Sequence, residues 1–211
     1  MPRVIEPSEV RARNTVALAR WLLGKHLVSR DPAAPDGAHR ARITETEAYH
    51  GPRDLACHAS KGRTPRTEVM FAPGGVWYVY LCYGVHEMLN LVTGPADWPA
   101  AVLIRGVETV SGPGRLTRAL GIDRRLNARP AAPASGLWLE DDGLVVPRRA
   151  ILAGPRVGIA YAGPVWAAKP WRFGLRTGCA AAPLTPAAGA SRRTVSSPAP
   201  SRARSRADGS R

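Results

Sequence analysis

The 211-residue sequence has few cysteines and no long hydrophobic run. Its three cysteines form no CxxC pair and leave one residue unpaired, so neither a disulfide framework nor a cysteine-based zinc site is expected. No segment approaches the roughly 18 to 20 consecutive apolar residues that a transmembrane helix requires, and the N-terminus does not resemble a secretory signal. These absences exclude a disulfide-rich secreted domain and a helical membrane protein, and they predict a soluble cytoplasmic protein.

Acidic residues are scarce relative to basic ones. The chain has 30 Lys and Arg against 16 Asp and Glu, for a net charge of +14, and only Lys25, Lys61 and Lys169 are lysines. The planar arginine side chain binds phosphate through two parallel hydrogen bonds. Arginine enrichment can also follow from genome base composition, but a charge of this size favours a polyanionic partner, in particular nucleic acid.

Length and composition together predict one domain and a tail. A chain of this length can build one domain with a substantial core, whereas two domains would each be small. From residue 179 onward the sequence consists almost wholly of Ala, Pro, Ser, Gly and Arg, with net charge +5 and too little apolar bulk to offset the entropy of ordering. We therefore expect an ordered domain over residues 1–178 and a disordered basic tail over residues 179–211.

The hydrophobic pattern predicts an α+β fold. A helix is expected over residues 14–24, with Asn14 as its N-cap and Gly24 at its end, and a second helix over residues 113–120. Strands are expected over residues 26–30, 39–49, 75–84, 86–93 and 101–108, the first two forming a hairpin. Because the strands follow one another without regular βαβ alternation, we expect a single domain with a curved, largely antiparallel sheet flanked by helices.

One predicted strand carries carboxylates where a core would be expected. In the segment ITETEAYHG, residues 43–51, the alternation of side chains along a strand places Ile43, Glu45, Glu47 and Tyr49 on one face. On a solvated face the two glutamates would be ordinary surface charges. A partly desolvated carboxylate beside an aromatic ring can instead act as a general base or stabilise the positive charge that develops when a bond to a sugar is cleaved.

Two further segments contain residues that suit nucleic acid. Residues 51–71 form a polar stretch with His58 and the cations Lys61, Arg63 and Arg66, which would suit backbone phosphates but could also be a solvated loop. Four of the thirteen aromatic residues fall within residues 77–83. Such a cluster is either core packing or a platform on which bases stack.

Several of these segments occur together in one known family. The strings RITETEAYHGPRDLACHA, GRTPR, GVWYVYLCYGVHEMLN and AVLIRGVE, followed by GPGRLTRALGI, GPRVGIAYAG and KPWRF, closely resemble the alkyladenine (3-methyladenine) DNA glycosylase family, also called the methylpurine DNA glycosylases. The resemblance extends in order and spacing over roughly residues 8–177, so residues 1–178 are expected to be a catalytic domain of this kind.

The resemblance implies a role for each matching residue. Glu47 corresponds to the glutamate that activates water, and Arg105 to the arginine that helps to place this water. Tyr83 corresponds to the tyrosine that fills the gap left in the duplex. The residues that correspond to the pocket for the flipped base are Tyr49, His58, Tyr80 and Asn90, of which Asn90 would exclude normal guanine by crowding its exocyclic amino group.

The implied activity is monofunctional hydrolysis of damaged purines in double-stranded DNA, which initiates base excision repair. The implied substrates are 3-methyladenine and 7-methylguanine, with hypoxanthine and etheno-adenine as further candidates. None of the three lysines falls in a motif that would supply a Schiff-base nucleophile, so no strand cleavage is expected. We further expect a monomer that needs no metal or cofactor and works in the cytoplasm in association with the nucleoid.

Two other functions are compatible with parts of the sequence. A noncatalytic DNA-lesion-binding module would use the same basic and aromatic surface, but it would not need Glu47 together with Arg105. A carbohydrate glycosidase would use Glu45 and Glu47 as its acid and base. This reading is disfavoured because the net charge is strongly positive and because neighbouring residues on one strand face do not oppose each other across a sugar.

Overall fold

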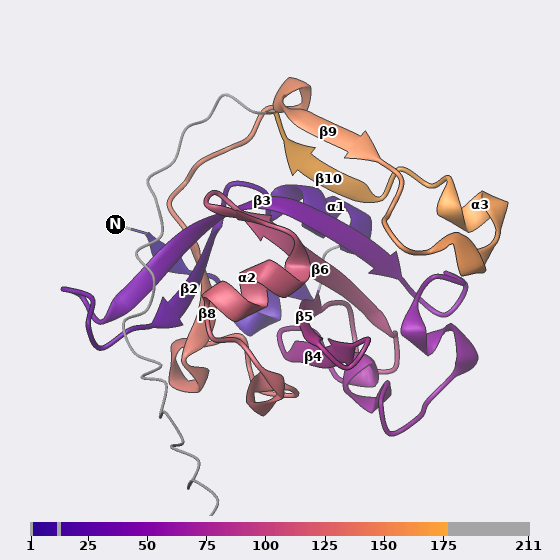
Figure 1. The fold of residues 1–211 in the computed structure, drawn as a ribbon, viewed down its shortest axis with the longest axis horizontal. Coiled ribbons are helices and arrows are strands. Elements are labelled where there is room, and N and C mark those ends of the chain that lie inside the picture. Colours follow the sequence, from indigo (N-terminus) through magenta and orange to yellow (C-terminus); the bar gives the residue numbers. More distant parts are fainter. Residues whose placement is uncertain (1, 12–13, 177–211) are drawn as a thin grey trace, which may run out of the picture.

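The structure, a computed structural model, describes residues 2–11 and 14–176, and in this part of the chain it contains ten strands and three short α-helices (Figure 1). The strands are β1 (Arg3–Val4), β2 (His26–Arg30), β3 (Ala38–His50), β4 (Trp77–Cys82), β5 (His86–Val92), β6 (Ala100–Val107), β7 (Val110–Ser111), β8 (Leu137–Asp141), β9 (Ile151–Gly154) and β10 (Arg172–Leu175). The α-helices are α1 (Thr15–Trp21), α2 (Pro113–Ala119) and α3 (Pro164–Ala167). All strand pairs described are antiparallel, which confirms the α+β class.

Strand β3 is the centre of the sheet. The strands follow the order β1-β8-β2-β3-β6-β5-β4, with β7 paired to β6 and with β10 paired to both β3 and β9. The first part of β3 pairs with β2, and its second part lies between β6 and β10 (Figure 1). The acidic segment of the sequence is therefore held between two strands, and it is not at a free edge.

The predicted elements agree well with those observed. Helix α1 begins after Asn14, whose side chain accepts hydrogen bonds from the amides of Val16 and Ala17, but it ends at Trp21 and not at Gly24. The hairpin of β2 and β3 and the start of α2 at Pro113 are as predicted. The predicted tail, residues 179–211, lies outside the described residues, as does the domain boundary at 178. No helix of the described part is long and apolar enough to cross a membrane.

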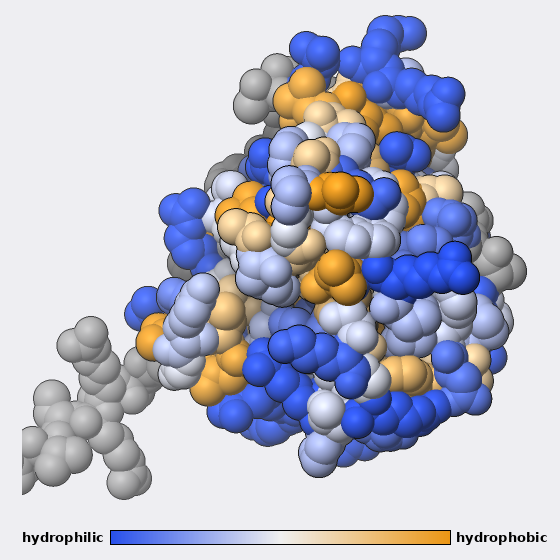
Figure 2. Space-filling view, turned by 90° about the vertical axis from the view of Figure 1, so that its right-hand side faces the viewer, coloured by the Kyte–Doolittle hydropathy of each residue, from blue (hydrophilic) through white to orange (hydrophobic). Residues whose placement is uncertain are grey.

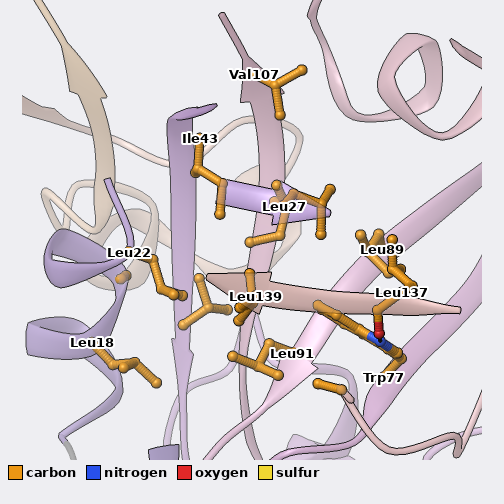
Figure 3. Packing of buried hydrophobic residues seen from close by; sticks show 14 of the residues in the cluster. Leu18, Leu22, Leu27, Ile43, Trp77, Leu89, Leu91, Val107, Leu137 and Leu139 are labelled. Atoms are coloured by element: carbon orange, nitrogen blue, oxygen red, sulfur yellow. Dashed lines mark hydrogen bonds between the residues drawn. The ribbon is translucent and has the colours of Figure 1, made fainter. Parts of the chain in front are cut away.

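The main hydrophobic core joins α1, α2 and the sheet. Figure 3 shows Leu18 of α1, and Leu22 directly after it, close to side chains of several strands. Trp77 of β4 is fully buried in this cluster, and its indole Nε1–H donates a 3.0 Å hydrogen bond to the carbonyl of Leu137 in β8 (Figure 3). Because β4 and β8 lie far apart in the strand order, this side chain connects two distant parts of the sheet.

An irregularity in the pairing of β3 with β6 shapes the acidic face. The register runs from Ile43 opposite Val107 to Glu45 opposite Gly106 and then to Thr46 opposite Ile104, so each strand contains a bulge. The prediction that Ile43 shares a face with the glutamates is wrong, because its side chain packs in the main core with Ala48, which alternates with Glu47 and so lies on the opposite face of β3. The bulge after it shifts the alternation of side chains.

Candidate active site

A cavity of about 570 Å³ brings together most of the residues predicted to form the site. Its volume is within the range of pockets that bind small molecules, and a nucleobase would fit. The predicted site residues that line it are Tyr49, His58, Arg66, Tyr80, Tyr83, Asn90 and Arg105. They come from β3, β4, the turn after β4, β5, β6 and the segment 51–71, which include parts that are distant in sequence.

Glu47 is fully buried immediately behind the wall of this cavity and is not itself a lining residue. Its Oε2 accepts a 2.8 Å hydrogen bond from the Tyr49 hydroxyl, and its Oε1 accepts a 2.8 Å hydrogen bond from the backbone amide of Val157. The guanidinium of Arg105 lies 3.4 Å from the same Oε1. All three partners of the carboxylate line the cavity, so Glu47 is in direct contact with residues of the cavity wall.

Arg105 is held between the two glutamates of β3. It lies at the bulge of β6, and its Nε–H donates a 3.2 Å hydrogen bond to Glu45 while another nitrogen faces Glu47. Glu45 in turn accepts a 3.1 Å hydrogen bond from Arg172 of β10. Glu45 is thus paired with two arginines, and we infer that it orients Arg105.

The pKa of Glu47 is raised above its ordinary value of 4.5 because burial disfavours the charged carboxylate. The charge of Arg105, the hydrogen bonds from the Val157 amide and the Tyr49 hydroxyl, and the charge of Arg156 act in the opposite direction. A carboxyl group with a raised pKa is a better proton acceptor than an ordinary surface carboxylate once it is ionised.

This shift predicts how the stability of the protein depends on pH. An acid whose pKa is higher in the folded than in the unfolded state makes folding less favourable as the pH rises from about 4.5 through the folded pKa. In the Glu47→Gln variant, the side chain at this position has no titratable group. The melting temperature of this variant minus that of the wild type should therefore increase with pH over this interval. Thermal unfolding of both proteins at matched pH values tests this, since other titrating groups cancel, and a pH-independent difference would contradict it.

Aromatic rings form one wall of the cavity. The ring of His58, at the start of a 3-10 helix (His58–Lys61), packs edge-on against Tyr80 with centroids 4.6 Å apart. Its Nδ1 lies 3.0 Å from the Tyr78 hydroxyl, and the rings of Tyr78 and Tyr80 are 5.2 Å apart. Burial lowers the pKa of His58 to about 4, so the imidazole is neutral at neutral pH. The wall therefore presents uncharged π surfaces.

Asn90 of β5 lies opposite Tyr78 and also lines the cavity. The residue is buried, and its side-chain amide donates hydrogen bonds of 3.2 and 3.3 Å to the carbonyls of Tyr78 and Met88. These bonds fix the side chain to the hairpin of β4 and β5. A polar group held in this way can distinguish ligands by shape, because it cannot turn aside.

Tyr83 lies at the tip of the β4–β5 hairpin, at the edge of the cavity. Its side chain is 91% exposed, and its backbone has φ of 50°, which is uncommon for a residue other than glycine. The next residue, Gly84, has φ of 71°, so the pair forms a tight turn of the kind that joins hairpin strands. A large aromatic ring at a strained and exposed position suggests a functional role.

The three predicted phosphate contacts differ in their surroundings. Arg66 lines the cavity, with its guanidinium 5.1 Å from the centroid of the Tyr80 ring. Lys61 is exposed at the end of its 3-10 helix. Arg63 does not line the cavity and forms ion pairs with Glu68 and Asp97. Figure 2 shows the molecular face on this side of the fold, where hydrophilic residues cover much of the lower part.

The segment after β9 contributes residues to which the sequence analysis assigned no role. Val157 and Tyr161 line the cavity, and both are more than half exposed. Arg156 is buried and forms a bidentate ion pair with Asp54. The string GPRVGIAYAG contributed to the resemblance, but a strand-and-turn pattern contains no signal that identifies a loop amide as a partner of Glu47.

Comparisons with known proteins identify the family of this chain. A family model described as methylpurine-DNA glycosylase matches residues 9–112 and 107–178. A protein from Anaeromyxobacter dehalogenans (strain 2CP-C), provisionally named a 3-methyladenine DNA glycosylase, is 49% identical over 178 residues, which are 81% of this chain and 83% of the relative. Proteins with the same provisional name from Myxococcus xanthus and Psychrobacter cryohalolentis are 48% and 44% identical, over 81% and 80% of this chain and 89% of each relative.

These matches define the class of protein as a DNA glycosylase, a hydrolase that acts on N-glycosyl bonds. The chain belongs to the methylpurine-DNA glycosylase family. The resemblance noted in the sequence is thereby confirmed, and a carbohydrate glycosidase is no longer a competing interpretation.

Proposed function

We propose that the protein is a monofunctional DNA glycosylase that flips alkylated or deaminated purines out of double-stranded DNA and hydrolyses their N-glycosidic bond with a water activated by Glu47. The substrates proposed are 3-methyladenine and 7-methylguanine, with hypoxanthine and etheno-adenine as further substrates. The observation that supports this most directly is the buried Glu47 carboxylate, whose three partners all line a cavity of nucleobase size.

The proposed reaction needs only one carboxylate. The two oxygens of an ionised carboxylate offer about four acceptor positions. The hydrogen bonds from Tyr49 and Val157 use two of them, and Arg105 forms an ion pair at 3.4 Å, which leaves capacity for a water. The oxygen of this water attacks C1′ of the sugar, its proton passes to Glu47, and the electrons of the C–N bond leave with the purine. The negative carboxylate also stabilises the positive charge that develops on the sugar.

The aromatic residues explain how a damaged base would be held. Tyr49, His58 and Tyr80 line the cavity, and aromatic ring faces attract cationic or electron-poor rings. Alkylated purines fit this description because N-alkylation places positive charge on the ring. The fixed amide of Asn90 would crowd the exocyclic amino group of normal guanine.

The partner proposed is duplex DNA with a damaged purine, bound by a monomer. Extrusion of a base is easiest at a damaged or mismatched position, so flipping itself contributes to selectivity. Tyr83 would fill the space that the flipped nucleotide leaves, while Lys61, Arg63 and Arg66 would contact backbone phosphates. Arg63 would have to exchange its present ion pairs for the phosphate.

The positions of the lysines support hydrolysis without strand cleavage. A glycosylase with lyase activity forms a Schiff base through an amine nucleophile. None of the three lysines, all within the described part of the chain, lines the cavity. Lys25 is buried and bound to Asp141, and Lys169 lies over the rings of Trp166 and Trp171.

Tyr83→Ala is expected to weaken binding of lesion-containing duplex more than it slows base release from the bound complex. Stacking of an aromatic side chain on bases contributes about 1 to 3 kcal/mol, so the dissociation constant should rise by about one order of magnitude. Fluorescence anisotropy and single-turnover kinetics at saturating enzyme separate the two effects. Val145→Ala is the control, because Val145 is 82% exposed and does not line the cavity. Equal weakening on damaged and undamaged duplex would instead make Tyr83 a general DNA contact.

The proposed function is tested by mixing the wild-type protein with duplexes that contain one 3-methyladenine, 7-methylguanine or hypoxanthine. The expected products are the free base and an abasic strand that is cut only after alkali treatment, and borohydride should trap no covalent complex. Binding of the damaged duplexes without release of any base would favour the noncatalytic lesion-binding module.

A further inference from the structure

We propose that the buried Asp54–Arg156 pair is a positioning device that fixes the Val157 amide and the Tyr49 ring relative to Glu47. This inference rests on the proposed function, because the geometry that it maintains is that of the proposed catalytic carboxylate. Neither residue lines the cavity, so both would act through their neighbours.

The pair is completely enclosed and bidentate. Both side chains are 0% exposed, and the two terminal nitrogens of Arg156 donate hydrogen bonds of 2.6 and 2.9 Å to the two oxygens of Asp54. The same nitrogens also donate to the carbonyls of Ala48 at 2.9 Å and Trp166 at 3.4 Å. Arg156 thus joins the end of β3, the segment after β3 and helix α3.

Asp54 organises the chain where β3 ends. Its carboxylate accepts hydrogen bonds from the backbone amides of His50 at 3.1 Å and Ala56 at 3.1 Å, in addition to the two from Arg156. These four bonds use the full acceptor capacity of the group. Asp54 therefore fixes the turn that leads from the Glu47 strand to His58, and Arg156 attaches the segment after β9 to this turn.

The consequence for Glu47 follows from chain connectivity and from packing. The residue after Arg156 is Val157, whose amide donates to Glu47 at 2.8 Å, so the anchored guanidinium sets the position of this donor. The guanidinium also lies over the ring of Tyr49, 4.8 Å from its centroid, and the Tyr49 hydroxyl donates to the other oxygen of Glu47. Two of the three partners of Glu47 thus depend on the same buried cation.

The first variant is Asp54→Asn/Arg156→Gln, which removes both charges together. Removing one partner would leave a buried unpaired charge, whereas replacing both avoids this. The asparagine oxygen can still accept a hydrogen bond from one of the two backbone amides that Asp54 binds. We expect single-turnover base release at saturating enzyme to slow by about tenfold to a hundredfold, as small misplacements of catalytic groups do, with a smaller change in lesion affinity. The matched control is Lys25→Gln/Asp141→Asn, which removes a largely buried pair away from the cavity and should leave the rate unchanged.

A pH profile separates positioning from general stability. The charged or titratable groups around Glu47 are Arg105 from β6, Tyr49 from β3 and Arg156 from the segment after β9, while Arg172 of β10 is bound to Glu45. Loss of the Arg156 charge raises the pKa of Glu47 further, so the acidic limb of the rate profile should move to higher pH in the double variant. Arg156→Lys keeps the positive charge, so the acidic limb of its rate profile should stay at the wild-type pH. Its rate on the pH-independent plateau should fall, because the bidentate hydrogen bonds to Asp54 are lost.

The outcomes distinguish this inference from the proposed function. If the wild type releases no base from any damaged duplex, the proposed function fails. If the wild type is active and the folded double variant has the wild-type rate and pH profile, the positioning role is wrong while the function stands. Should the double variant not fold, as judged by its melting transition, Arg156→Lys decides: a wild-type plateau rate in that variant overturns the inference.

Discussion

Glu47→Gln is expected to slow release of the damaged base by about 10² to 10⁴-fold, the usual contribution of a general base, while binding of the lesion is largely retained. Glutamine has nearly the same shape and can still accept the hydrogen bond from the Val157 amide, but it can neither take a proton from water nor stabilise positive charge on the sugar. Single-turnover release from a duplex containing 3-methyladenine measures the first effect, and anisotropy measures the second.

Glu140→Gln is a suitable control for this experiment. Glu140 is also a buried glutamate, in β8, where it binds Arg40 and the indole of Trp138 and does not line the cavity. Its replacement should affect stability and leave base release unchanged. Release by Glu47→Gln at the wild-type rate would remove this residue from the mechanism.

Trp77→Ala is expected to reduce the free energy of unfolding by about 3 to 5 kcal/mol, the usual cost of removing a large buried aromatic side chain. A domain of this size has roughly 5 to 15 kcal/mol in total, so much of the stability would be lost. The substitution opens a hole in the main core and also leaves the carbonyl of Leu137 without its indole donor.

Urea denaturation of the wild type and Trp98→Ala provides the comparison. Trp98 is 40% exposed and packs edge-on against His50 outside the main core, so its removal should cost clearly less. Equal losses in the two variants would mean that burial of Trp77 is not what stabilises the sheet.

The fold was predictable from the sequence because its signals are local. The cap at Asn14, the proline at the start of α2 and the turn between β2 and β3 act over a few residues, and each is found where expected. The face of Ile43 was not predictable, because the bulges that shift it arise from pairing with β6 and have no signature in the sequence of β3.

The site was predictable only in part. The resemblance, which covers most of the chain, led us to expect one pocket that contains Tyr49, His58, Tyr80 and Asn90, and all four line the cavity. Their chemical roles remain predictions. The buried Arg156 could not be distinguished from the other 26 arginines by composition. In a basic protein, an arginine is expected to be exposed to solvent or to bind DNA. Its role became apparent only when the fold placed Asp54 and Tyr49 beside it.

The central claim is that the carboxylate at position 47 faces the sugar of a base held in the cavity. A crystal structure of Glu47→Gln bound to duplex DNA with a 3-methyladenine analogue tests this most directly. The predicted result is a flipped base between the rings of Tyr49, His58 and Tyr80, with one water between the side chain at position 47 and C1′. A base that remains stacked in the duplex, or one whose C1′ faces away from position 47, would contradict the account.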